Sequence, residues 1–467
     1  MIKNNPDGTK PYFILIFVNL KGKSVKVFKM EVYKFGGTSV GSIENMRSVM
    51  NLITDGKQKM VVLSAMSGTT NSLVEISDYL TKKNKESALT QISILEKKYY
   101  NVVFDLYKRI EMKELGKKVL EEHFDFIKSF TTGSFTEAGE RAILAQGELI
   151  STALFTLLMQ EEGHNALLLP ALEFMKIDSD KMPDSRFIKQ KLNEILTAQP
   201  KADYYITQGF ICKNELGEID NLQRGGSDYT ATLIGAAINS SEVQIWTDID
   251  GFHNNDPRFV SNTTRVDLLS FNEAAELAYF GAKILHPQTV LPAKNNNIPV
   301  RLKNTMNPPD PGTLITGESK GAGIKAVAAK DGITAIKIRS GRMLNAYGFM
   351  KNIFEIFEYF KTSVDMVTTS EVAVSVTIDN PKHLEEIVNE LKEYGDVEVD
   401  KNQTIVCIVG NMIAEEKGFA SKVFIALDNI PIRMISYGGS RHNISVLINT
   451  NDKKETLVAL SEKLLNV

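Results

Sequence analysis

The chain contains 467 residues, which at about 150 residues per domain predicts roughly three folded units. Hydrophobic residues make up 43% and charged residues 24%, as in soluble globular proteins, and this composition excludes a globally disordered chain. Lys plus Arg (54) nearly balance Asp plus Glu (57), and a net charge of −3 supplies no basic field for duplex nucleic acid. We therefore expect small-molecule chemistry rather than nucleic acid binding.

The two cysteines and the N-terminal segment bear on the compartment. Cys212 and Cys407 lie far apart without CxxC spacing, which argues against a disulfide framework or a zinc site. The longest apolar run, residues 12–20, has about half of the roughly 18 residues that a membrane-spanning helix needs. We expect a cytoplasmic protein with no membrane partner, and we interpret residues 1–29 as an N-terminal extension.

From residue 30 the pattern is strand, turn, helix, strand. Residues 31–35 and 60–63 read as strands around an amphipathic helix at 43–52, and residues 72–130 read as solvated helices rich in Lys, Glu and Leu. Further strands are predicted at 166–169, 204–208, 243–247 and 299–302, with helical patterns between them. This alternation predicts an α/β fold whose mainly parallel sheet is sandwiched by helices, with ligands beyond the carboxyl ends of the strands.

The C-terminal third repeats itself. The Pro-rich stretch 307–312 predicts a boundary near 310–325, so the first domain should span 30–318. Gly348-Phe349 and Gly418-Phe419 begin similar helices 70 residues apart, which predicts two units, at 333–402 and 403–467. Each reads as a ferredoxin-like βαββαβ unit. In the first unit the strands are expected at 334–338, 364–368, 373–378 and 397–399, and the helices near 349–361 and 383–393. In the second the strands are expected at 404–409, 432–436 and 444–448, and the helices near 418–428 and 453–464. This second unit lacks its last strand, and residues 323–330 are expected to complete it.

The strongest local motif is KFGGTS at residues 34–39, on a strand-to-helix turn. Gly36 and Gly37 let the backbone approach a phosphate, the turn amides favour an anion, and Lys34 adds a positive charge. It is not a Walker A motif, because the lysine precedes the glycines. Two alternatives remain: a plain turn, or a GxSxG nucleophile elbow at residues 37–41. The elbow would make Ser39 a hydrolase nucleophile, with its base among His123, His164, His253, His286, His383 and His442.

Two further motifs suit anion chemistry. In RGGSDYT at residues 224–230, Arg224 offers a fork for a carboxylate or phosphate and Asp228 could orient Lys34, although a surface pair with a helix cap is the alternative. In WTDIDGF at residues 246–252 the glycine comes too early for a calcium loop, and Phe259 stands where the bidentate glutamate belongs. A strand-end loop that binds a nucleotide is the better interpretation, with Arg258 near the phosphates.

Together with FGAK at 280–283 and LHP at 285–287, these motifs resemble the amino-acid kinase superfamily and, more closely, the monofunctional aspartokinases. The resemblance covers residues 30–467 and includes the repeats, which resemble ACT regulatory domains. Because little sequence follows the repeats, we expect a monofunctional enzyme without a fused homoserine dehydrogenase. The resemblance implies transfer of the ATP γ-phosphoryl group to the β-carboxylate of L-aspartate, with Mg²⁺ bridging phosphate oxygens. The product, 4-phospho-L-aspartate, begins lysine, threonine and methionine synthesis.

The resemblance also implies roles for individual residues. Lys34 would neutralise the transferring phosphoryl group and Asp228 would hold that lysine. The implied aspartate-binding residues are Ser64, Ala65, Thr70, Glu148 and Arg224. The implied nucleotide-binding residues are Lys34, Gly36, Gly37, Ser39, Thr247, Asp248, Phe252, His253, Arg258 and Lys283. His253 stands where many relatives have tyrosine, and Glu148 taken alone could be an ordinary surface glutamate. Protein ligands of Mg²⁺ stay open.

The first repeat is expected to bind an amino-acid effector. The residues that match an effector site are Met343, Ala346, Phe349, Met350, Ser363, Val364, Asp365 and Glu371. Asp365 and a nearby Glu371 suit an amine-bearing effector, which favours L-lysine over threonine, although Ala346 replaces a serine found in some lysine-sensitive relatives. The alternative is a loop and strand pair without a ligand. Edge strands of such units need covering, so we expect a homodimer or homotetramer. A catalytically inactive amino-acid sensor is the other function considered.

Overall fold

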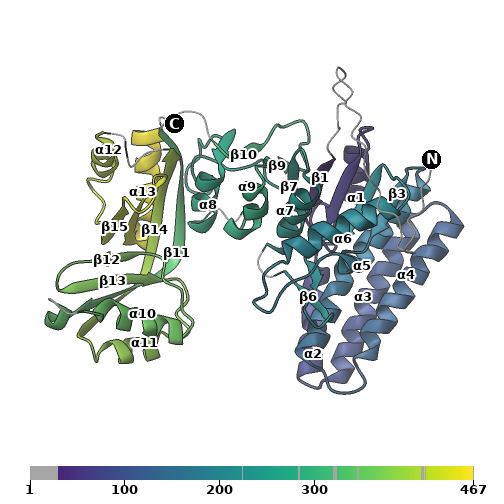
Figure 1. Ribbon diagram of the computed structural model, residues 1–467, viewed down its shortest axis with the longest axis horizontal. Helices are drawn as coiled ribbons and strands as arrows, with labels where there is room; N and C mark the ends of the chain where they lie inside the picture. Colours follow the sequence, from purple (N-terminus) through teal and green to yellow (C-terminus); the bar gives the residue numbers. More distant parts are fainter. Residues whose placement is uncertain are drawn as a thin grey trace, which may run out of the picture.

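The computed structural model describes residues 30–222, 225–281, 284–318, 323–343, 347–411, 415 and 417–465. The expected extension at 1–29 lies outside them. The described chain forms an eight-stranded and a six-stranded sheet, which lie at opposite ends of the molecule, and a two-stranded hairpin (Figure 1). Following the family resemblance of the sequence, we call the parts built on the eight-stranded and the six-stranded sheet the catalytic domain and the regulatory domain.

The sheet of the catalytic domain is mainly parallel, as predicted. Its strand order is β3-β4-β2-β1-β7-β9-β10-β8, and the β9–β10 pairing is antiparallel. The strands are β1 Glu31–Phe35, β2 Lys59–Leu63, β3 Ala166–Leu169, β4 Tyr204–Gln208, β7 Val243–Thr247, β8 Leu268–Ser270, β9 Val300–Asn304 and β10 Thr313–Thr316. Because β1 lies between β2 and β7, the turn that follows it reaches the middle of the sheet's carboxyl edge.

Helices pack on both faces of this sheet. One apolar core joins it to α1 Ile43–Ile53, α2 Thr69–Thr81, α3 Lys85–Leu106, α4 Ile110–Ser129 and α5 Glu137–Glu161. A second core joins it to α6 Ser185–Ala198, α7 Gly226–Ile238, α8 Phe271–Tyr279 and α9 Leu291–Asn295. Shorter elements are η1 Ala171–Glu173, η2 Pro287–Val290 and the hairpin of β5 Ile211–Lys213 and β6 Ile219–Asn221. The hairpin, β8 and β10 are absent from the predicted elements.

Local chemistry explains where several helices begin. Ser42 accepts a hydrogen bond from the Asn45 amide ahead of α1, and Ser270 and Glu273 form a capping box on α8. Helix α5 is the one described helix that is long and apolar enough to cross a membrane. Because 78% of its most apolar window is buried inside the protein, α5 is a core helix here. The buried central part of α5 lies behind the loop that follows β2.

The regulatory domain is one antiparallel sheet in the order β12-β13-β11-β14-β16-β15. Two long strands, β11 Gly323–Arg339 and β14 Asp396–Asn411, run through it side by side. The other elements are η3 Gly341–Met343, α10 Phe349–Tyr359, β12 Val367–Thr369, β13 Ala373–Ile378, α11 Leu384–Leu391, α12 Phe419–Ala426, β15 Met434–Tyr437, β16 Asn443–Asn449, η4 Thr450–Asp452, α13 Lys453–Leu460 and a π-helical turn, Ser461–Leu465.

The repeat is visible in backbone conformation as well as in sequence. Gly348 and Gly418 cap α10 and α12 with φ of 84° and 77°, a left-handed conformation that favours glycine. The first half of β11 pairs with β14 from Ile324↔Gly410 to Lys330↔Ile405, so residues 323–330 do lie beside the second unit. They are continuous with the first strand of the first unit, and the register shifts between Lys330 and Ile333. Sequence patterns predict two strands here, whereas the structure has one irregular strand.

Candidate active site

Lys34 and Asp228 form an ion pair at the carboxyl edge of the catalytic sheet. Lys34 lies near the end of β1, and Asp228 lies in the first turn of α7. Lys34 Nζ is 2.7 Å from Asp228 Oδ1, and the two side chains are only 12% and 14% exposed. The structure thus brings together the two residues that sequence analysis assigned to catalysis, one from each glycine-rich motif. A mostly buried ammonium that is paired with one carboxylate can still bind a second anion.

The glycine turn after β1 is closely confined by its neighbours. The Gly36 amide donates to the Trp246 carbonyl over 3.4 Å, which ties the turn to β7. A Cβ on Gly37 would come within 2.9 Å of the Ala65 carbonyl oxygen, whereas a Cβ on Gly36 would meet Lys34 Nζ at an ordinary 3.6 Å. Glycine is therefore required at position 37, because the backbone of the turn approaches the backbone at Ala65 closely. The backbone at Gly36 lies beside the Lys34 ammonium.

Glu148 of α5 lies behind the loop that follows β2. Its Oε1 accepts a hydrogen bond from the Ala65 amide over 3.2 Å, and the residue is 5% exposed. Burial raises the pKa of Glu148 from 4.5 to about 7, although the bond from Ala65 lowers it. Gly147 allows this approach, because a Cβ there would come within 2.8 Å of the Ala65 Cβ. The site therefore holds a carboxyl group that titrates near neutrality and could face a substrate ammonium.

The same loop contacts α7 and α3. Ser64 Oγ donates to Ser227 Oγ over 3.0 Å, so the residue next to Asp228 is bonded to the β2 loop. Thr69 shares a hydrogen bond of 2.8 Å with the fully buried Tyr99, and Lys98 Nζ donates to the Ser67 carbonyl over 3.1 Å. Thr70, a predicted aspartate ligand, is exposed at the start of α2.

Sequence analysis missed these supporting contacts. For Ser227 a signal existed, because it lies inside the RGGSDYT motif. Tyr99 and Lys98 have no local signal, since only tertiary packing brings α3 to the loop.

Ser39 is not placed as a nucleophile. It is 1% exposed, and its hydroxyl shares a hydrogen bond of 2.8 Å with Thr305. A nucleophile elbow needs an exposed Oγ beside a base. The structure therefore contradicts the hydrolase interpretation, and Ser39 can serve a phosphate only through its backbone.

Five of the predicted nucleotide residues lie at and after the end of β7: Thr247, Asp248, Phe252, His253 and Arg258. Thr247 Oγ1 donates to Asp248 Oδ1 over 3.0 Å on an exposed surface. His253 Nε2 is 2.9 Å from Asp250 Oδ1, and its Nδ1 is 2.9 Å from Thr263 Oγ1, so both ring nitrogens already have partners. The Phe252 side chain is 1% exposed and its amide donates to Thr313 Oγ1, so only its backbone carbonyl, which already accepts from the Val266 amide, is left for a ligand.

Arg258 is the most open of these residues. It is 77% exposed and forms a 2.6 Å ion pair with Asp256. A phosphate would have to compete with Asp256 for its guanidinium. The structure therefore shows Arg258 engaged with an acid, and its contact with a nucleotide stays a prediction.

The loop that carries these residues is anchored on the second regulatory unit. Asn255 Nδ2 donates to the Leu457 carbonyl of α13 over 2.9 Å, and the Val327 amide of β11 donates to the Asn254 carbonyl over 2.8 Å. Val260 is buried in the core of that unit, and Lys453 Nζ lies 4.4 Å from the Phe259 ring centroid. The candidate nucleotide loop is thus packed directly against the regulatory domain.

Arg224, Lys283 and Ala346 lie outside the described residues, but two of these positions have described neighbours. A Cβ on Gly225 would meet the side chains of His286 and Thr289, so the LHP motif packs against the RGGSDYT motif. Gly281, two residues before Lys283, packs against the Ala329 carbonyl of β11. The described parts of the LHP and FGAK motifs are thus packed against the start of α7 and against β11, respectively.

The predicted effector residues form part of one apolar cluster. Phe349 is buried, and Met343, Met350 and Val364 pack against the same core, with Ser363 exposed beside them. Asp365 is engaged instead of open: Oδ1 accepts from Lys330 Nζ at 2.9 Å and from the Tyr279 hydroxyl at 2.6 Å. Its side chain is 0% exposed.

Glu371 is not close to Asp365 in this chain. The Asp365 amide donates to Thr377 of β13, whereas Glu371 lies in the turn between β12 and β13. At about 3.3 Å per residue the two acids are separated by roughly 15–20 Å. The expectation of a nearby second acid is wrong within one protomer. The predicted strand at 364–368 also begins later, because Asp365 and Met366 bond to Thr377 outside the β12 ladder.

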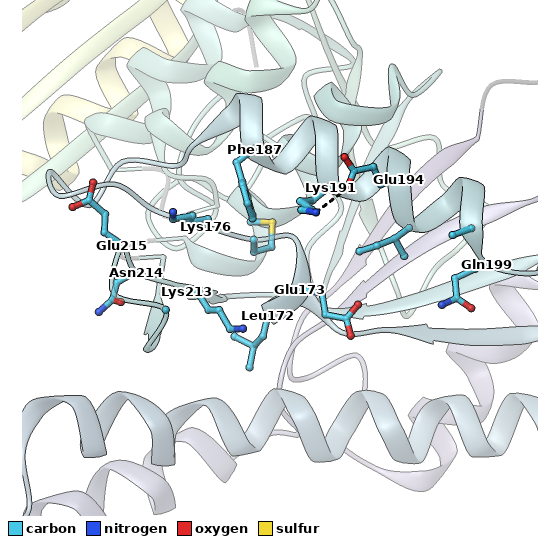
Figure 2. A pocket seen from close by; sticks show the side chains of 14 residues that line it. Leu172, Glu173, Lys176, Phe187, Lys191, Glu194, Gln199, Lys213, Asn214 and Glu215 are labelled. Atoms are coloured by element: carbon cyan, nitrogen blue, oxygen red, sulfur yellow. Dashed lines mark hydrogen bonds and ion pairs between the residues drawn. The ribbon is translucent and has the colours of Figure 1, made fainter. Parts of the chain in front are cut away.

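A cavity of about 540 Å³ lies elsewhere, between η1, α6 and the β5–β6 hairpin (Figure 2). Phe187, Met175 and Leu172 line it together with Lys176 and Lys213. It includes none of the predicted site residues, so the candidate active site is not this cavity. Across the described residues no group of three or more His, Cys, Asp or Glu could hold a metal ion.

Two family models match the chain. The amino acid kinase family model matches residues 29–304, and an ACT domain model matches residues 406–464. The first covers the catalytic sheet from β1 to β9, and the second covers most of the second regulatory unit. Both agree with the fold described above.

Individual relatives match over nearly the full length. Lysine-sensitive aspartokinase 3 of Escherichia coli K12 is 33% identical over 450 residues, which cover 93% of this chain and 98% of the relative. The crystal structure of E. coli aspartokinase III in complex with aspartate and ADP is 31% identical with a TM-score of 0.80, and covers 94% of this chain and 100% of that one. A second structure, with lysine and aspartate, is 32% identical with a TM-score of 0.77, and covers 93% and 99%.

Proposed function

Because the chain belongs to the amino acid kinase family and, within it, to the aspartokinases, we propose that it transfers the γ-phosphoryl group of ATP to the β-carboxylate of L-aspartate. The observation that carries this proposal is the Lys34–Asp228 pair beside the glycine turn. Reaction of a carboxylate with a triphosphate brings two anions together, so the site needs positive charge and backbone amides more than a base. The aspartate β-carboxylate is already ionised near neutral pH.

Lys34 would carry the electrostatic part of the reaction. Its ammonium would neutralise charge on the transferring phosphoryl group, and Asp228 would hold the ammonium in one position. The amides of the Gly36-Gly37 turn would contact phosphate oxygens, since that backbone lies beside Lys34 Nζ. Loss of a transition-state charge contact of this kind costs a factor of roughly 100 to 1,000 in turnover.

Glu148 would bind the α-ammonium of aspartate. Its carboxyl group lies behind Ala65, and a cation beside it would favour the ionised form that burial disfavours. Ser64, Ala65 and Thr70 would line the same loop, and Arg224 would take the α-carboxylate.

ATP would lie along the end of β7. The residues proposed to contact ATP are Thr247, Asp248, Phe252 through its backbone, His253, Arg258 and Lys283. Mg²⁺ would accompany the nucleotide and supply positive charge at its phosphates.

The regulatory domain would make the enzyme sensitive to an end product. We propose that an amino acid, with L-lysine favoured, binds near Asp365 and the cluster of Met343, Phe349, Met350, Ser363 and Val364. The lysine complex of E. coli aspartokinase III supports this choice of ligand. The reaction would be the first step of lysine, threonine and methionine synthesis, in the cytoplasm.

Strands β12 and β15 come last at the two ends of the hydrogen-bonded strand order of the regulatory sheet, and they also lie close to each other. Val367 and Ile435 on them are 40% and 43% exposed. Such edges need covering, which supports a homodimer or homotetramer formed through the regulatory domain.

The test is an assay of the purified protein with Mg-ATP and L-aspartate, in which the acyl phosphate is trapped as a hydroxamate. We expect aspartate-dependent hydroxamate that falls about a thousandfold in Lys34→Ala. Lys176→Ala, a lysine on the distant cavity, is the matched control and should keep full activity. Amino-acid binding without any aspartate-dependent product would refute the kinase proposal and leave a sensor.

A further inference from the structure

Four side chains meet where α8 of the catalytic domain contacts the first regulatory unit. Lys330 Nζ lies 2.9 Å from Asp365 Oδ1 and 3.0 Å from Asp379 Oδ2. The Tyr279 hydroxyl donates to the same Asp365 Oδ1 over 2.6 Å, and Lys330 Nζ lies 4.5 Å from the centroid of the Tyr279 ring. We call these four residues the junction cluster. Helix α8 stands between the two domains in Figure 1.

The junction cluster has one cation for two carboxylates. Asp365 is 0% exposed, Lys330 is 19% exposed and Asp379 is 34% exposed. The second oxygen of Asp365, Oδ2, is buried and has no hydrogen-bond partner among the described residues. A buried carboxylate oxygen without a donor is costly, so this group retains capacity for one more cationic or N–H donor.

Lys330 supplies to Asp365 the same chemical group that an amino-acid effector would bring. An incoming ammonium can reach Asp365 only by using Oδ2 or by displacing Lys330 and Tyr279 from Oδ1. Partial burial and the bond to Asp365 raise the pKa of Tyr279, so the phenol stays protonated and donates. An ammonium on Oδ2 would lie beside the ammonium of Lys330, and the two like charges repel each other. Effector binding is therefore expected to compete with the contacts that Lys330 and Tyr279 make at Asp365.

Tyr279 connects this carboxylate to the predicted nucleotide site. It is the last residue of α8, and the FGAK motif with Lys283 follows at once. Gly281 packs on the Ala329 carbonyl, next to Lys330, so a side chain there would clash with β11. The chain from Tyr279 to Gly281 is thus held at two points. Tyr279 is bonded to Asp365 in the junction cluster, and Gly281 packs against Ala329 of β11.

We propose that Lys330 and Tyr279 occupy Asp365 in place of the effector, and that their displacement by an effector ammonium releases the segment leading to Lys283 and weakens ATP binding. This inference rests on the proposed effector site at Asp365 and adds the two residues that couple it to the nucleotide. Tyr279 acts as a positioning residue, since its role is argued through its contacts with Asp365 and Lys330.

The test compares Tyr279→Phe with wild type in the full-length protein. The variant removes only the hydroxyl that bonds Asp365. We expect the KM for ATP without effector to rise about tenfold, the scale of one hydrogen bond to a charged group, with kcat and the KM for aspartate unchanged. Because binding is reciprocally coupled, calorimetry should show L-lysine binding about tenfold more tightly. Tyr359→Phe, on the exposed face of α10, is the matched control and should match wild type in every measurement.

Lys330→Gln gives an independent measurement. Removal of the internal cation should also tighten lysine binding, and added lysine should restore the melting temperature that the variant loses. Wild-type lysine affinity and wild-type KM for ATP in Tyr279→Phe would overturn the inference, as would weaker lysine binding in Lys330→Gln.

These outcomes differ from failure of the effector site itself. If Asp365→Ala is inhibited by lysine as wild type is, or if wild type responds to neither lysine nor threonine, the proposed effector site is wrong. If Asp365→Ala loses its response but Tyr279→Phe behaves as wild type, the site is right and the junction cluster does not transmit its occupancy.

Discussion

Glu148 gives the sharpest prediction, because the fold penalises its charge. Its pKa rises from 4.5 to about 7, and each tenfold change in proton affinity corresponds to about 1.4 kcal/mol. The ionised carboxylate therefore costs roughly 3 kcal/mol in the folded, substrate-free protein. Glu148→Gln keeps the shape and the acceptor for the Ala65 amide but carries no charge. The variant should be more stable than wild type above pH 7 and unable to bind aspartate normally.

The direction of the change in stability with pH follows from the difference in the Glu148 pKa between the folded and the unfolded protein. A raised carboxyl pKa means that the folded state holds the proton more tightly than the unfolded state. This contribution to stability is complete below about pH 4.5 and is lost as the pH rises through about 7. The free energy of unfolding of wild type should therefore fall relative to Glu148→Gln by up to about 3 kcal/mol between pH 4.5 and pH 8.

The single tryptophan allows the measurement to be made in the relevant domain. Trp246 is 3% exposed in β7 and stacks on Phe35 of β1, so its fluorescence reports unfolding of the catalytic sheet in urea. Glu137→Gln, whose side chain is 90% exposed on the same helix, is the control and should run parallel to wild type. In activity, the KM for aspartate should rise in wild type as the pH falls below 7.

Parallel stability curves for wild type and Glu148→Gln from pH 4.5 to pH 8 would refute the reasoning, because they would mean that Glu148 is not buried as a charge. A variant that keeps the wild-type KM for aspartate would separately refute the role in ammonium binding.

Three further variants test the remaining contacts. Asp228→Asn removes the charge that holds Lys34 and should lower single-turnover rates about 100-fold; a rate within a factor of two would show that Lys34 needs no anchor. Gly37→Ala places a Cβ 2.9 Å from the Ala65 carbonyl and should lower kcat/KM about tenfold or more, whereas Gly36→Ala meets only an ordinary 3.6 Å contact and should be milder; equal effects would contradict the geometry. Asp365→Ala should raise the half-inhibitory lysine concentration about tenfold in a titration, and an unshifted curve would place the effector elsewhere.

The catalytic core is predictable from sequence because its chemistry is local. The strand, glycine turn and helix around Lys34 lie within a few residues, and so do Asp228 and the start of α7. Parallel strands bring their carboxyl ends to one edge, so two such motifs must converge. Repeats 70 residues apart likewise predict the two regulatory units, and a missing strand predicts the pairing of residues 323–330.

Contacts between distant elements are not predictable in this way. Nothing local places Tyr99 against Thr69, Asn255 against α13 or Tyr279 against Asp365. Asp365 and Glu371 are close in sequence, but the extended strand β12 between them holds the two acids apart. A sequence also shows which residues are polar, but it does not show which of them already have partners inside the protein. Ser39 is bonded to Thr305 and Asp365 to Lys330.

The two long strands of the regulatory domain have a consequence for how the chain folds during synthesis. Residues 333–400 can pair among themselves, but residues 326–328, which are nearly fully buried in the finished protein, receive their β14 partners only with residues 407–409. Until residues 407–409 are made, the edge of the apolar strand at 326–328 has no β14 partner, although the first regulatory unit that follows it can already be folded. Loss of the second unit would leave that edge uncovered for good, so truncation after residue 402 should yield an aggregating protein rather than an enzyme that merely lacks one module.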